Sequence, residues 1–339
     1  MKNYSTKITK NIQSFSTILL VEEAIRRGIK VSHINNNQRE MSFLELSYKN
    51  HFEYIKGQNS SKTSFPAFYA TENKAITRSL LLRSNISVAK GSIFCKGDLE
   101  KSLEFAKKIG YPVVIKPFDG CHGESVFMGL DSEKKCKEAI GIVFKKHKYA
   151  LIEKEFNGKE HRFLASRNKI FAVANRDPAN VVGDGIHTIR ELIKIKNCDS
   201  NRGENYEKPH QKIKIDKFVK QNLDEQKIDL NYTPSKEEKI YLKKESNIST
   251  GGDSVDVTDE VHPELKKIVI KSVRAIPGLG YAGVDLLSSQ DISKKPTKKS
   301  YIIIELNCSP GFDMQHFPYK GKPRDVAKGI FDLLFPETK

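Results

Sequence analysis

The amino-acid sequence predicts an α/β protein, in the mixed α+β sense, with two or three domains. Between residues 98 and 175, helical patterns alternate with short runs of β-branched and apolar residues. Two later apolar runs, at 281–287 and 301–311, predict a closing pair of strands. The chain has 339 residues, which is enough for several hydrophobic cores and favours more than one domain.

Residues 1–70 are expected to form a small N-terminal α/β domain. Apolar residues recur at helical spacing from residue 15, Gly28 ends this helix, and residues 29–34 have the pattern of a strand. The helix and strand together are predicted to be half of a βαβ unit. A second helix is expected to start near Thr71 and to run through residue 82.

Residues 71–150 are expected to form the next domain, in which the elements follow one another regularly. Asp98 is expected to cap a helix that Gly110 ends. Asp131 is expected to cap another helix, which runs to about His147. The expected strands are 111–116, 126–129 and 149–154.

The last domain is expected to cover residues 151–339. It begins with a hairpin whose arms are 161–166 and 169–175, and Thr188–Glu191 has the spacing of a capping box. Residues 197–245 are polar and have little apolar periodicity, so they predict a helical insertion or mobile arm rather than a core. Pro263 is well placed in the first turn of a helix that ends near residue 275.

The composition is that of a soluble protein. Hydrophobic residues make up 38% of the chain and charged residues 29%, and no apolar run approaches the roughly 20 residues of a membrane span. The N-terminus lacks the pattern of a signal peptide. The five cysteines are scattered without a Cys-x-x-Cys pair, which predicts free thiols, no structural zinc and a cytoplasmic location.

The formal net charge of +16 raises the question of a nucleic-acid partner. The basic residues are mostly lysines, spread along the chain and interleaved with Glu and Asn. This distribution favours solvated lysine faces and a site for an anionic small molecule over a nucleic-acid groove.

The two predicted closing strands carry oxygen ligands. Side chains alternate across a strand, so Glu305 and Asn307 project from one face, and Asp285 reaches the same face if the strands pair as a hairpin. Two carboxylates and an amide oxygen suit Mg²⁺ carried in with a nucleotide phosphate. The simpler alternative is an ordinary hairpin whose acidic side chains face water.

A lysine and a glycine-containing loop follow one another in the middle domain. Lys116 ends an apolar strand, where it either meets an anion or extends to solvent. The loop 119–125 can bring backbone N–H groups close to phosphate oxygens, although a plain hairpin turn is the alternative. It is not a Walker motif, because no Gly-Lys-Ser/Thr follows.

Further candidate binding residues lie after residue 150. The strand at 151–156 turns into an acidic linker, which offers backbone groups to an adenine ring and a carboxylate, Glu160, to a ribose. Arg162 and Arg176 lie on the two arms of the next hairpin and suit phosphate or carboxylate. The run 247–253 is small and polar, consistent with either a structural loop or the lining of a polar pocket.

Taken in order, these features resemble the ATP-grasp carboxylate–amine ligases, in particular the subgroup of cyanophycin synthetase and the ATP-grasp half of bifunctional glutathione synthetase. The resemblance covers about 70–336, and residues 20–60 show a weaker similarity. The matching stretches are 72–74 with Thr77, 110–117, 175–185, 188–189, 201–203, 246–259, 283–285, 305–311 and 334–336.

The resemblance implies an ATP-grasp fold, in which two α+β subdomains grip ATP, and it implies roles for single residues. Catalytic roles would fall to Arg176, at the transferred phosphoryl group, and to Lys116. ATP would be bound by Lys74, Lys116, Gly120, His122, Gly123, Ser125, Glu153, Lys154, Phe156 and Glu160. The substrate carboxylate would lie at Arg162, Asn247, Ser249, Thr250, Gly251 and Gly252. Magnesium, or manganese in its place, would be held by Asp285, Glu305 and Asn307.

The implied reaction joins a carboxylate of an amino acid or small peptide to an amine through an acyl phosphate. Glutathione synthesis from γ-glutamylcysteine and glycine is the leading hypothesis, and a cyanophycin-synthetase-like or other peptide ligase is the alternative. A non-catalytic nucleotide-binding or nucleic-acid-binding protein is a rival from another class. No membrane partner is expected, and dimerisation stays open.

The sequence departs from the family pattern in three places. Lys243 and Lys244 stand where the family usually has an arginine before the Asn-x-Ser-Thr-Gly-Gly run. Lysine lacks the planar fork of arginine, so the geometry at the acceptor changes. Residues 314–318 read Met-Gln-His-Phe-Pro, where the family tends to have Met-His-x-x-Pro. A lone ATP-grasp unit is expected, without the partner domain of either subgroup.

Overall fold

A computed structural model describes residues 12, 14–34, 43–118, 126–204 and 208–339. The chain forms two units. The first unit combines residues 1–62, 160–261 and 309–339, and the second unit combines residues 63–159 and 262–308. This grouping does not test the domain boundaries predicted after residues 70 and 150. Those boundaries stay a prediction.

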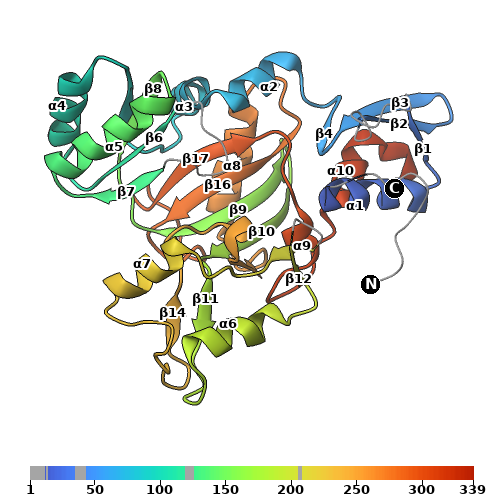
Figure 1. The fold of residues 1–339 in the computed structure, drawn as a ribbon. Helices are drawn as coiled ribbons and strands as arrows, with labels where there is room; N and C mark the ends of the chain where they lie inside the picture. Colours follow the sequence, from blue (N-terminus) through green and yellow to red (C-terminus); the bar gives the residue numbers. More distant parts are fainter. Residues whose placement is uncertain (1–11, 13, 35–42, 119–125, 205–207) are drawn as a thin grey trace. The chain divides into compact units, whose positions relative to one another are not determined.

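One part of the second unit is a four-stranded antiparallel sheet that packs against two helices (Figure 1). In spatial order its strands are β5 (Gly91–Cys95), β8 (Tyr149–Lys154), β6 (Val113–Pro117) and β7 (Phe127–Leu130). Helices α4 (Leu99–Ile109) and α5 (Glu133–Lys146) share a buried core with the sheet, which includes Leu103, Ile140 and Ile115. This sheet and its helices agree with the predicted order of elements.

The caps of the two helices match the sequence only in part. Gly110 ends α4 with φ of +81°, a conformation that favours glycine. Asp98 precedes α4, but its side chain makes no capping hydrogen bond. Helix α5 is capped by Ser132, whose hydroxyl accepts from the N–H of Lys135, so the predicted cap at Asp131 is wrong by one residue.

The rest of the second unit contains a hairpin and three helices. The hairpin consists of β16 (Tyr281–Ser288) and β17 (Tyr301–Asn307), and the helices are α2 (Phe65–Glu72), α3 (Lys74–Arg83) and α8 (Pro263–Ala275). The predicted helix at 263–275 is confirmed. The single helix expected from Thr71 is two helices, because the Asn73 side chain accepts from the N–H groups of Ala75 and Ile76 and starts α3 anew.

The N-terminal part of the first unit is an antiparallel meander beside helix α1 (Phe15–Arg26). Its strands are β1 (Lys30–His33), β2 (Phe43–Tyr48), β3 (His51–Lys56) and β4 (Asn59–Ser60). The predicted helix and strand are both present, but β1 pairs antiparallel with β2, so the expected half of a βαβ unit is wrong. Helix α10 (Val326–Leu334), from the other end of the chain, packs on α1 (Figure 1).

Three more antiparallel strands of the first unit carry candidate site residues. Strands β9 (Lys159–Ser166) and β10 (Ile170–Asp177) form the predicted hairpin. Strand β15 (Asp253–Asp256) pairs with the other edge of β10, and this register places Ser254 opposite Arg176. The short helix α9 (Asp313–His316) packs against β10 and β15.

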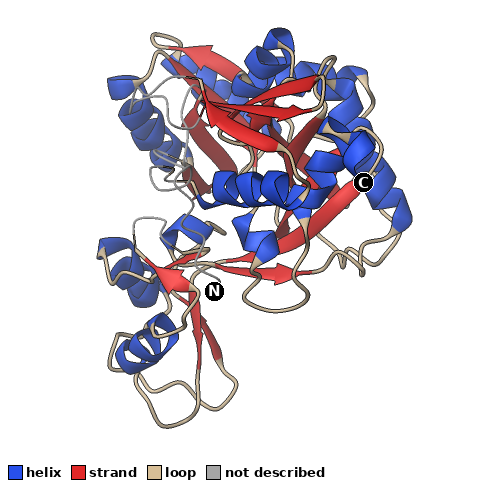
Figure 2. Ribbon diagram, turned by 90° about the vertical axis from the view of Figure 1, so that its right-hand side faces the viewer, coloured by secondary structure: helices blue, strands red, loops and turns tan. Residues whose placement is uncertain are grey.

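Residues 179–242 form a lobe of the first unit, seen from the side in Figure 2. Its elements are β11 (Asn180–Val182), α6 (Ile189–Asn197), β12 (Arg202–Gly203), β13 (His210–Gln211), α7 (Lys217–Glu225) and β14 (Lys239–Tyr241). The predicted capping box opens α6, with Thr188 and Glu191 bonded reciprocally. The expectation that 197–245 lacks a core is wrong, because Val219, Leu223 and Ile240 are buried in one cluster with α6.

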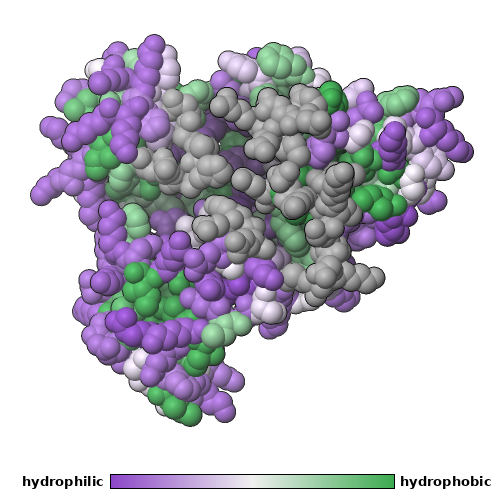
Figure 3. Space-filling view, turned by 45° about the vertical axis from the view of Figure 1, so that its right-hand side comes forward, coloured by the Kyte–Doolittle hydropathy of each residue, from purple (hydrophilic) through white to green (hydrophobic). Residues whose placement is uncertain are grey.

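The surface is largely hydrophilic in the view of Figure 3, with apolar residues showing on the lobe at the bottom. Among the described residues of the lobe, the large exposed hydrophobic side chains are Val182, Ile186, Ile195, Phe218 and Tyr241. Over the residues that the structure describes, no helix combines the length and apolarity needed to cross a membrane.

Candidate functional site

Lys74 is positioned by the start of helix α3 in the second unit. Asn73 caps that helix, so Lys74 is its first residue. The Lys74 ammonium donates to the carbonyl oxygen of Phe118 at 3.4 Å. Lys74 thus lies where β6 leads into the predicted phosphate loop. The loop residues proposed to bind ATP, Gly120, His122, Gly123 and Ser125, lie outside the described residues.

Lys116 and Glu153, two candidate ATP-binding residues of the second unit, form an ion pair. They lie on neighbouring strands, β6 and β8, and the Lys116 Nζ is 2.7 Å from Glu153 Oε2. The other carboxylate oxygen, Oε1, is 3.3 Å from Nη1 of Arg78 on α3. All three side chains are mostly buried, so two cations share one carboxylate away from bulk water. Burial lowers the pKa of Arg78, and the Glu153 carboxylate opposes that shift.

Arg78 is not among the site residues predicted from the sequence. Its one local signal is the spacing: it follows Lys74 by four residues, so both basic side chains lie on one face of α3. The partner Glu153 is 75 positions away in sequence, and only the fold brings the two together.

Lys154 and Phe156, both predicted to frame adenine, lie at and just after the end of strand β8. The Lys154 ammonium donates to the carbonyl oxygens of Tyr111 at 2.6 Å and Gly110 at 3.2 Å. It therefore ties the end of β8 to the turn before β6. Phe156 follows β8 and is half-buried.

The two predicted metal-binding strands pair as expected. In the β16–β17 register Asp285 lies opposite Glu305, and Gly283 lies opposite Asn307. Asp285 is 3% exposed, while Glu305 and Asn307 are half-buried. A carboxylate as buried as Asp285 requires a cation or hydrogen-bond donors. Two carboxylates and an amide oxygen on paired strands are the ligand chemistry of a hard divalent cation.

The ligand set at this hairpin includes only two acidic side chains. Among the residues described by the structure, no cluster of three or more His, Cys, Asp or Glu residues is arranged to hold a metal ion. Asn307 is the third residue predicted as a metal ligand on the paired strands. The residues fit magnesium by their oxygen chemistry.

In the first unit, Glu160 and Arg176 form an ion pair with each other. Both side chains are mostly buried. The Asn175 amide donates to the carbonyl oxygen of Glu160 at 3.0 Å, which fixes β10 against β9. Arg162 is 7% exposed and lies opposite Ala174. The predicted ribose ligand and the predicted catalytic arginine are thus brought into direct contact.

The predicted substrate loop 247–252 is ordered by its own hydrogen bonds. The Asn247 side chain accepts from the N–H of Ser249 at 3.0 Å and from its hydroxyl at 2.7 Å. Gly251 has φ of +102°, and a Cβ there would lie 2.8 Å from a side-chain carbon of Ile213. Glycine at 251 is therefore required both by the backbone and by the space.

A buried ionic cluster contacts this loop at Gly251. Arg202 is fully buried and donates to the carbonyl oxygen of Gly251 at 3.1 Å and to the Asp253 carboxylate. Lys196 donates to the other oxygen of Asp253 at 2.6 Å. The ring of Tyr319 lies 4.9 Å from the Lys196 ammonium and 5.5 Å from the Arg202 guanidinium. Arg202 lies within the 201–203 motif, and no role was predicted for it.

The two lysines that replace the family's arginine are both in ion pairs. Lys243 is 8% exposed and lies 2.8 Å from Asp216, the residue that caps α7. Lys244 is exposed and lies 2.5 Å from Glu225 at the other end of α7. Both lysines therefore fasten α7 to the chain that leads into the 247–252 loop.

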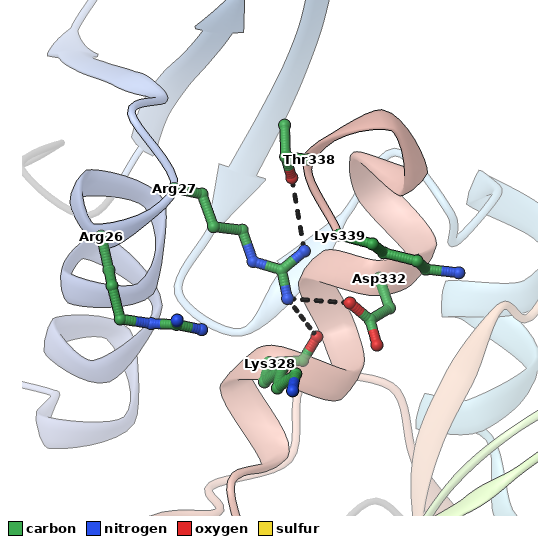
Figure 4. Close-up of a pocket in the computed structure, with 6 residues that line it drawn as sticks. All are labelled: Arg26, Arg27, Lys328, Asp332, Thr338 and Lys339. Carbon is green, nitrogen blue, oxygen red and sulfur yellow. Dashed lines mark hydrogen bonds and ion pairs between the residues drawn. The ribbon is translucent and has the colours of Figure 1, made fainter.

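A pocket of about 320 Å³ lies elsewhere in the first unit, beside α1 and α10 (Figure 4). Arg27 crosses it and donates to Asp332 at 2.8 Å, to the carbonyl oxygen of Lys328 at 3.0 Å and to Thr338 at 3.3 Å. These bonds fasten α1 to the end of the chain. The pocket contains none of the predicted site residues.

Comparison with known proteins agrees with these local features. Residues 14–67 match an ATP-grasp-like domain, residues 73–160 the ATP-binding domain of the carbamoyl-phosphate synthase L chain, and residues 243–332 a RimK-like ATP-grasp domain. The glutathione biosynthesis bifunctional protein of Clostridium perfringens is 38% identical over 94% of this chain. Cyanophycin synthetase of Trichormus variabilis is 35% identical over 96%.

This chain is also similar to a solved structure of a bifunctional glutathione synthetase. The bifunctional glutathione synthetase of Pasteurella multocida superimposes with a TM-score of 0.76 and 32% identity over 96% of this chain. The chain spans 41% of the length of the Clostridium protein, 35% of the cyanophycin synthetase and 45% of the Pasteurella chain. It is therefore similar to one part of each of these proteins.

Proposed function

We propose that this chain is an ATP-dependent ligase of the ATP-grasp type that joins a carboxylate to an amine, which the matches to three ATP-binding and ATP-grasp domain models support. The observation that carries the proposal is the grouping of candidate residues in the second unit. Lys116 is paired with Glu153 in a mostly buried setting, and the buried Asp285 lies opposite Glu305. Cations for phosphate and oxygen ligands for a divalent metal ion thus belong to one unit of the fold.

In this proposal Lys74 and Lys116 hold the ATP phosphates. Lys74 is fixed at the N-terminal end of α3, where the helix dipole also favours an anion. The backbone beside Glu153, Lys154 and Phe156 frames the adenine ring. The residues that would hold magnesium are Asp285, Glu305 and Asn307, and the ion would neutralise charge on the phosphate oxygens.

The first unit supplies the residues proposed for the acid and the phosphoryl group. Arg176 lies opposite Ser254, two residues after the 247–252 loop, so the strand register connects the phosphoryl ligand with the carboxylate loop. Polar groups of that loop and the buried Arg162 would orient the acid. Glu160, which holds Arg176, would bind the ribose or position the arginine.

The proposed chemistry has two steps. An oxygen of the substrate carboxylate attacks the γ-phosphorus of ATP, which forms an acyl phosphate and releases ADP. The amine then attacks the carbonyl carbon, and phosphate leaves as the amide forms. The first step needs charge neutralisation more than a protein nucleophile, which matches the lysines and arginine proposed for this site.

The substrates we propose are amino acids or small peptides, with γ-glutamylcysteine and glycine as the leading pair. The names of the relatives from Clostridium and Pasteurella support that pair, and the cyanophycin synthetase supports other amino-acid ligations. The net charge of +16 keeps a non-catalytic nucleotide-binding or nucleic-acid-binding role as the rival function.

Phosphate release tests the proposal. With ATP and magnesium, wild-type protein should release phosphate only when both an acid and an amine are present, first γ-glutamylcysteine with glycine and then pooled amino acids and dipeptides. Mass spectrometry should identify the amide. Binding of ATP or polynucleotide with no amine-dependent phosphate release across these substrates favours the rival function.

Two variants test the metal assignment in the same assay. Asp285→Asn and Glu305→Gln keep the shape of the side chains but remove a charge, so ATP turnover should fall at least about a hundredfold. Circular dichroism should show a retained fold. Turnover like that of the wild type in both variants contradicts the assignment of these residues to magnesium.

A further inference from the structure

Glu153 binds a different cation with each of its two carboxylate oxygens. Oε2 is 2.7 Å from the Lys116 ammonium, and Oε1 is 3.3 Å from the Arg78 guanidinium. The exposed fractions are 14% for the Glu153 and Lys116 side chains and 20% for Arg78. One buried negative charge is therefore matched by two positive charges that come from different elements, β6 and α3.

The side chains of Lys116 and Arg78 differ in how readily they can move away from the Glu153 carboxylate. Lysine is a single charge on a flexible four-carbon chain, whereas the arginine guanidinium is planar and directional. Lys116 is also the cation proposed above to contact a phosphate group of ATP. When it turns toward the phosphate, Glu153 loses one of its two partners.

Whether Glu153 still has a cation beside it then affects the free energy of nucleotide binding. A mostly buried carboxylate that keeps a cation stays compensated, while one left without a cation carries an uncompensated buried charge. Because Arg78 contacts Oε1 and Lys116 contacts Oε2, loss of the lysine contact leaves the arginine contact geometrically intact.

We propose that Arg78 is a positioning residue of the nucleotide site, which keeps Glu153 paired while Lys116 is transferred from Glu153 to a phosphate group. The inference rests on the proposed ATP-binding role of Lys116. It concerns binding alone, so it does not depend on which acid and amine are joined.

The test compares the binding of ADP and of adenosine to purified wild-type protein and to Arg78→Met, by calorimetry in the presence of magnesium. ADP carries phosphates that draw Lys116 away, and adenosine carries none. The dissociation constant for ADP should rise about tenfold in Arg78→Met, and that for adenosine should change less than about twofold. A merely structural role for Arg78 would weaken both ligands alike.

Two further variants sharpen the comparison. Arg83→Met removes an exposed arginine from the last turn of the same helix, and it should leave ADP binding unchanged. In a Glu153→Gln background there is no buried charge to keep paired, so Arg78→Met should have little effect on ADP binding.

The outcomes separate the two proposals. Equal loss of ADP and adenosine binding, or an undiminished effect of Arg78→Met in the Glu153→Gln background, overturns the role of Arg78 and leaves the ligase proposal standing. Wild-type protein that binds neither ADP nor ATP overturns both.

Discussion

Glu153 reaches its two cations because a glycine lies beside it on β5. In the β5–β8 register Gly91 is opposite Glu153, and a Cβ on Gly91 would lie 2.6 Å from Glu153 Cγ and 2.6 Å from the carbonyl oxygen of Ile152. Part of that contact is with backbone, which cannot turn away. The absence of one methyl group at residue 91 thus sets the position of the carboxylate that holds Lys116 and Arg78.

Gly91→Ala should therefore weaken both the fold and nucleotide binding. Overpacking of this kind costs about 1–3 kcal/mol, and displacement of Glu153 should also raise the dissociation constant for ADP. Urea unfolding and calorimetry measure the two effects.

The matched control is Gly141→Ala in α5, where an added Cβ meets no atom within 4 Å. That change should be neutral or stabilise the helix by up to about 1 kcal/mol. If Gly91→Ala behaves like Gly141→Ala in both measurements, residue 91 does not position Glu153.

At the scale of single elements, the start of helix α10 is capped by two side chains, Asp325, which accepts from the N–H of Lys328, and His316. His316 Nε2 accepts from the backbone N–H groups of Val326 at 3.0 Å and Ala327 at 3.2 Å, at the start of α10. A nitrogen that accepts these bonds must be unprotonated. Burial lowers the pKa of His316, although the neighbouring carboxylates of Asp325 and Glu23 oppose the shift.

This cap predicts that stability falls in mild acid. The folded-state pKa of His316 lies below the unfolded-state value of about 6.5, so the cap is complete above that pH. As pH falls below about 6.5 toward the folded-state pKa, the histidine takes up a proton in the unfolded chain before it does so in the folded protein. One such group lowers the free energy of unfolding by at most about 1.4 kcal/mol per pH unit.

Urea unfolding at pH 7.5 and pH 5.5 should therefore show a smaller loss in His316→Gln than in the wild type. Glutamine places an amide oxygen near the position of Nε2 and does not titrate. The buried His210 has a lowered pKa as well, so part of the wild-type loss should remain. An equal loss in both proteins contradicts the role of His316 as a titrating cap.

Elements were predictable from the sequence where their signals are local. The capping box at Thr188–Glu191, the Pro263 helix start and the β9–β10 hairpin each depend on a few adjacent residues, and all three are confirmed. The lobe was missed because its core draws single apolar residues from positions 179 to 242, separated by charged ones. Val219 and Leu223 do recur at helical spacing within α7, but no short window shows that the separate elements of the lobe pack together.

The candidate site was predictable as residue types but not as contacts. The order of motifs indicated Lys116, Glu153 and the Asp285–Glu305 hairpin, because strand alternation and a known family pattern are properties of sequence. The pairing of Arg78 with Glu153 and of Arg202 with Asp253 joins residues 75 and 51 positions apart. Such pairs depend on strand register and helix placement, which the sequence alone does not specify.

At the scale of the whole molecule, the chain divides its candidate chemistry between two units. The second unit contains the residues proposed to bind phosphate and magnesium, and the first contains Arg176 and the 247–252 loop. The net charge of +16 favours attraction of anionic ligands over the whole surface. We propose that the protein uses ATP to activate a carboxylate for attack by an amine.

Transfer of labelled oxygen tests this claim most directly. Wild-type protein is incubated with ATP, magnesium, glycine and γ-glutamylcysteine whose glycine-accepting carboxylate is labelled with ¹⁸O, or with another labelled acid and its amine that support turnover. In the proposed mechanism the attacking carboxylate oxygen leaves with the phosphate, so mass spectrometry should find one ¹⁸O atom in each phosphate released and the other in the amide. Unlabelled phosphate, or phosphate release that needs no amine, would contradict the account.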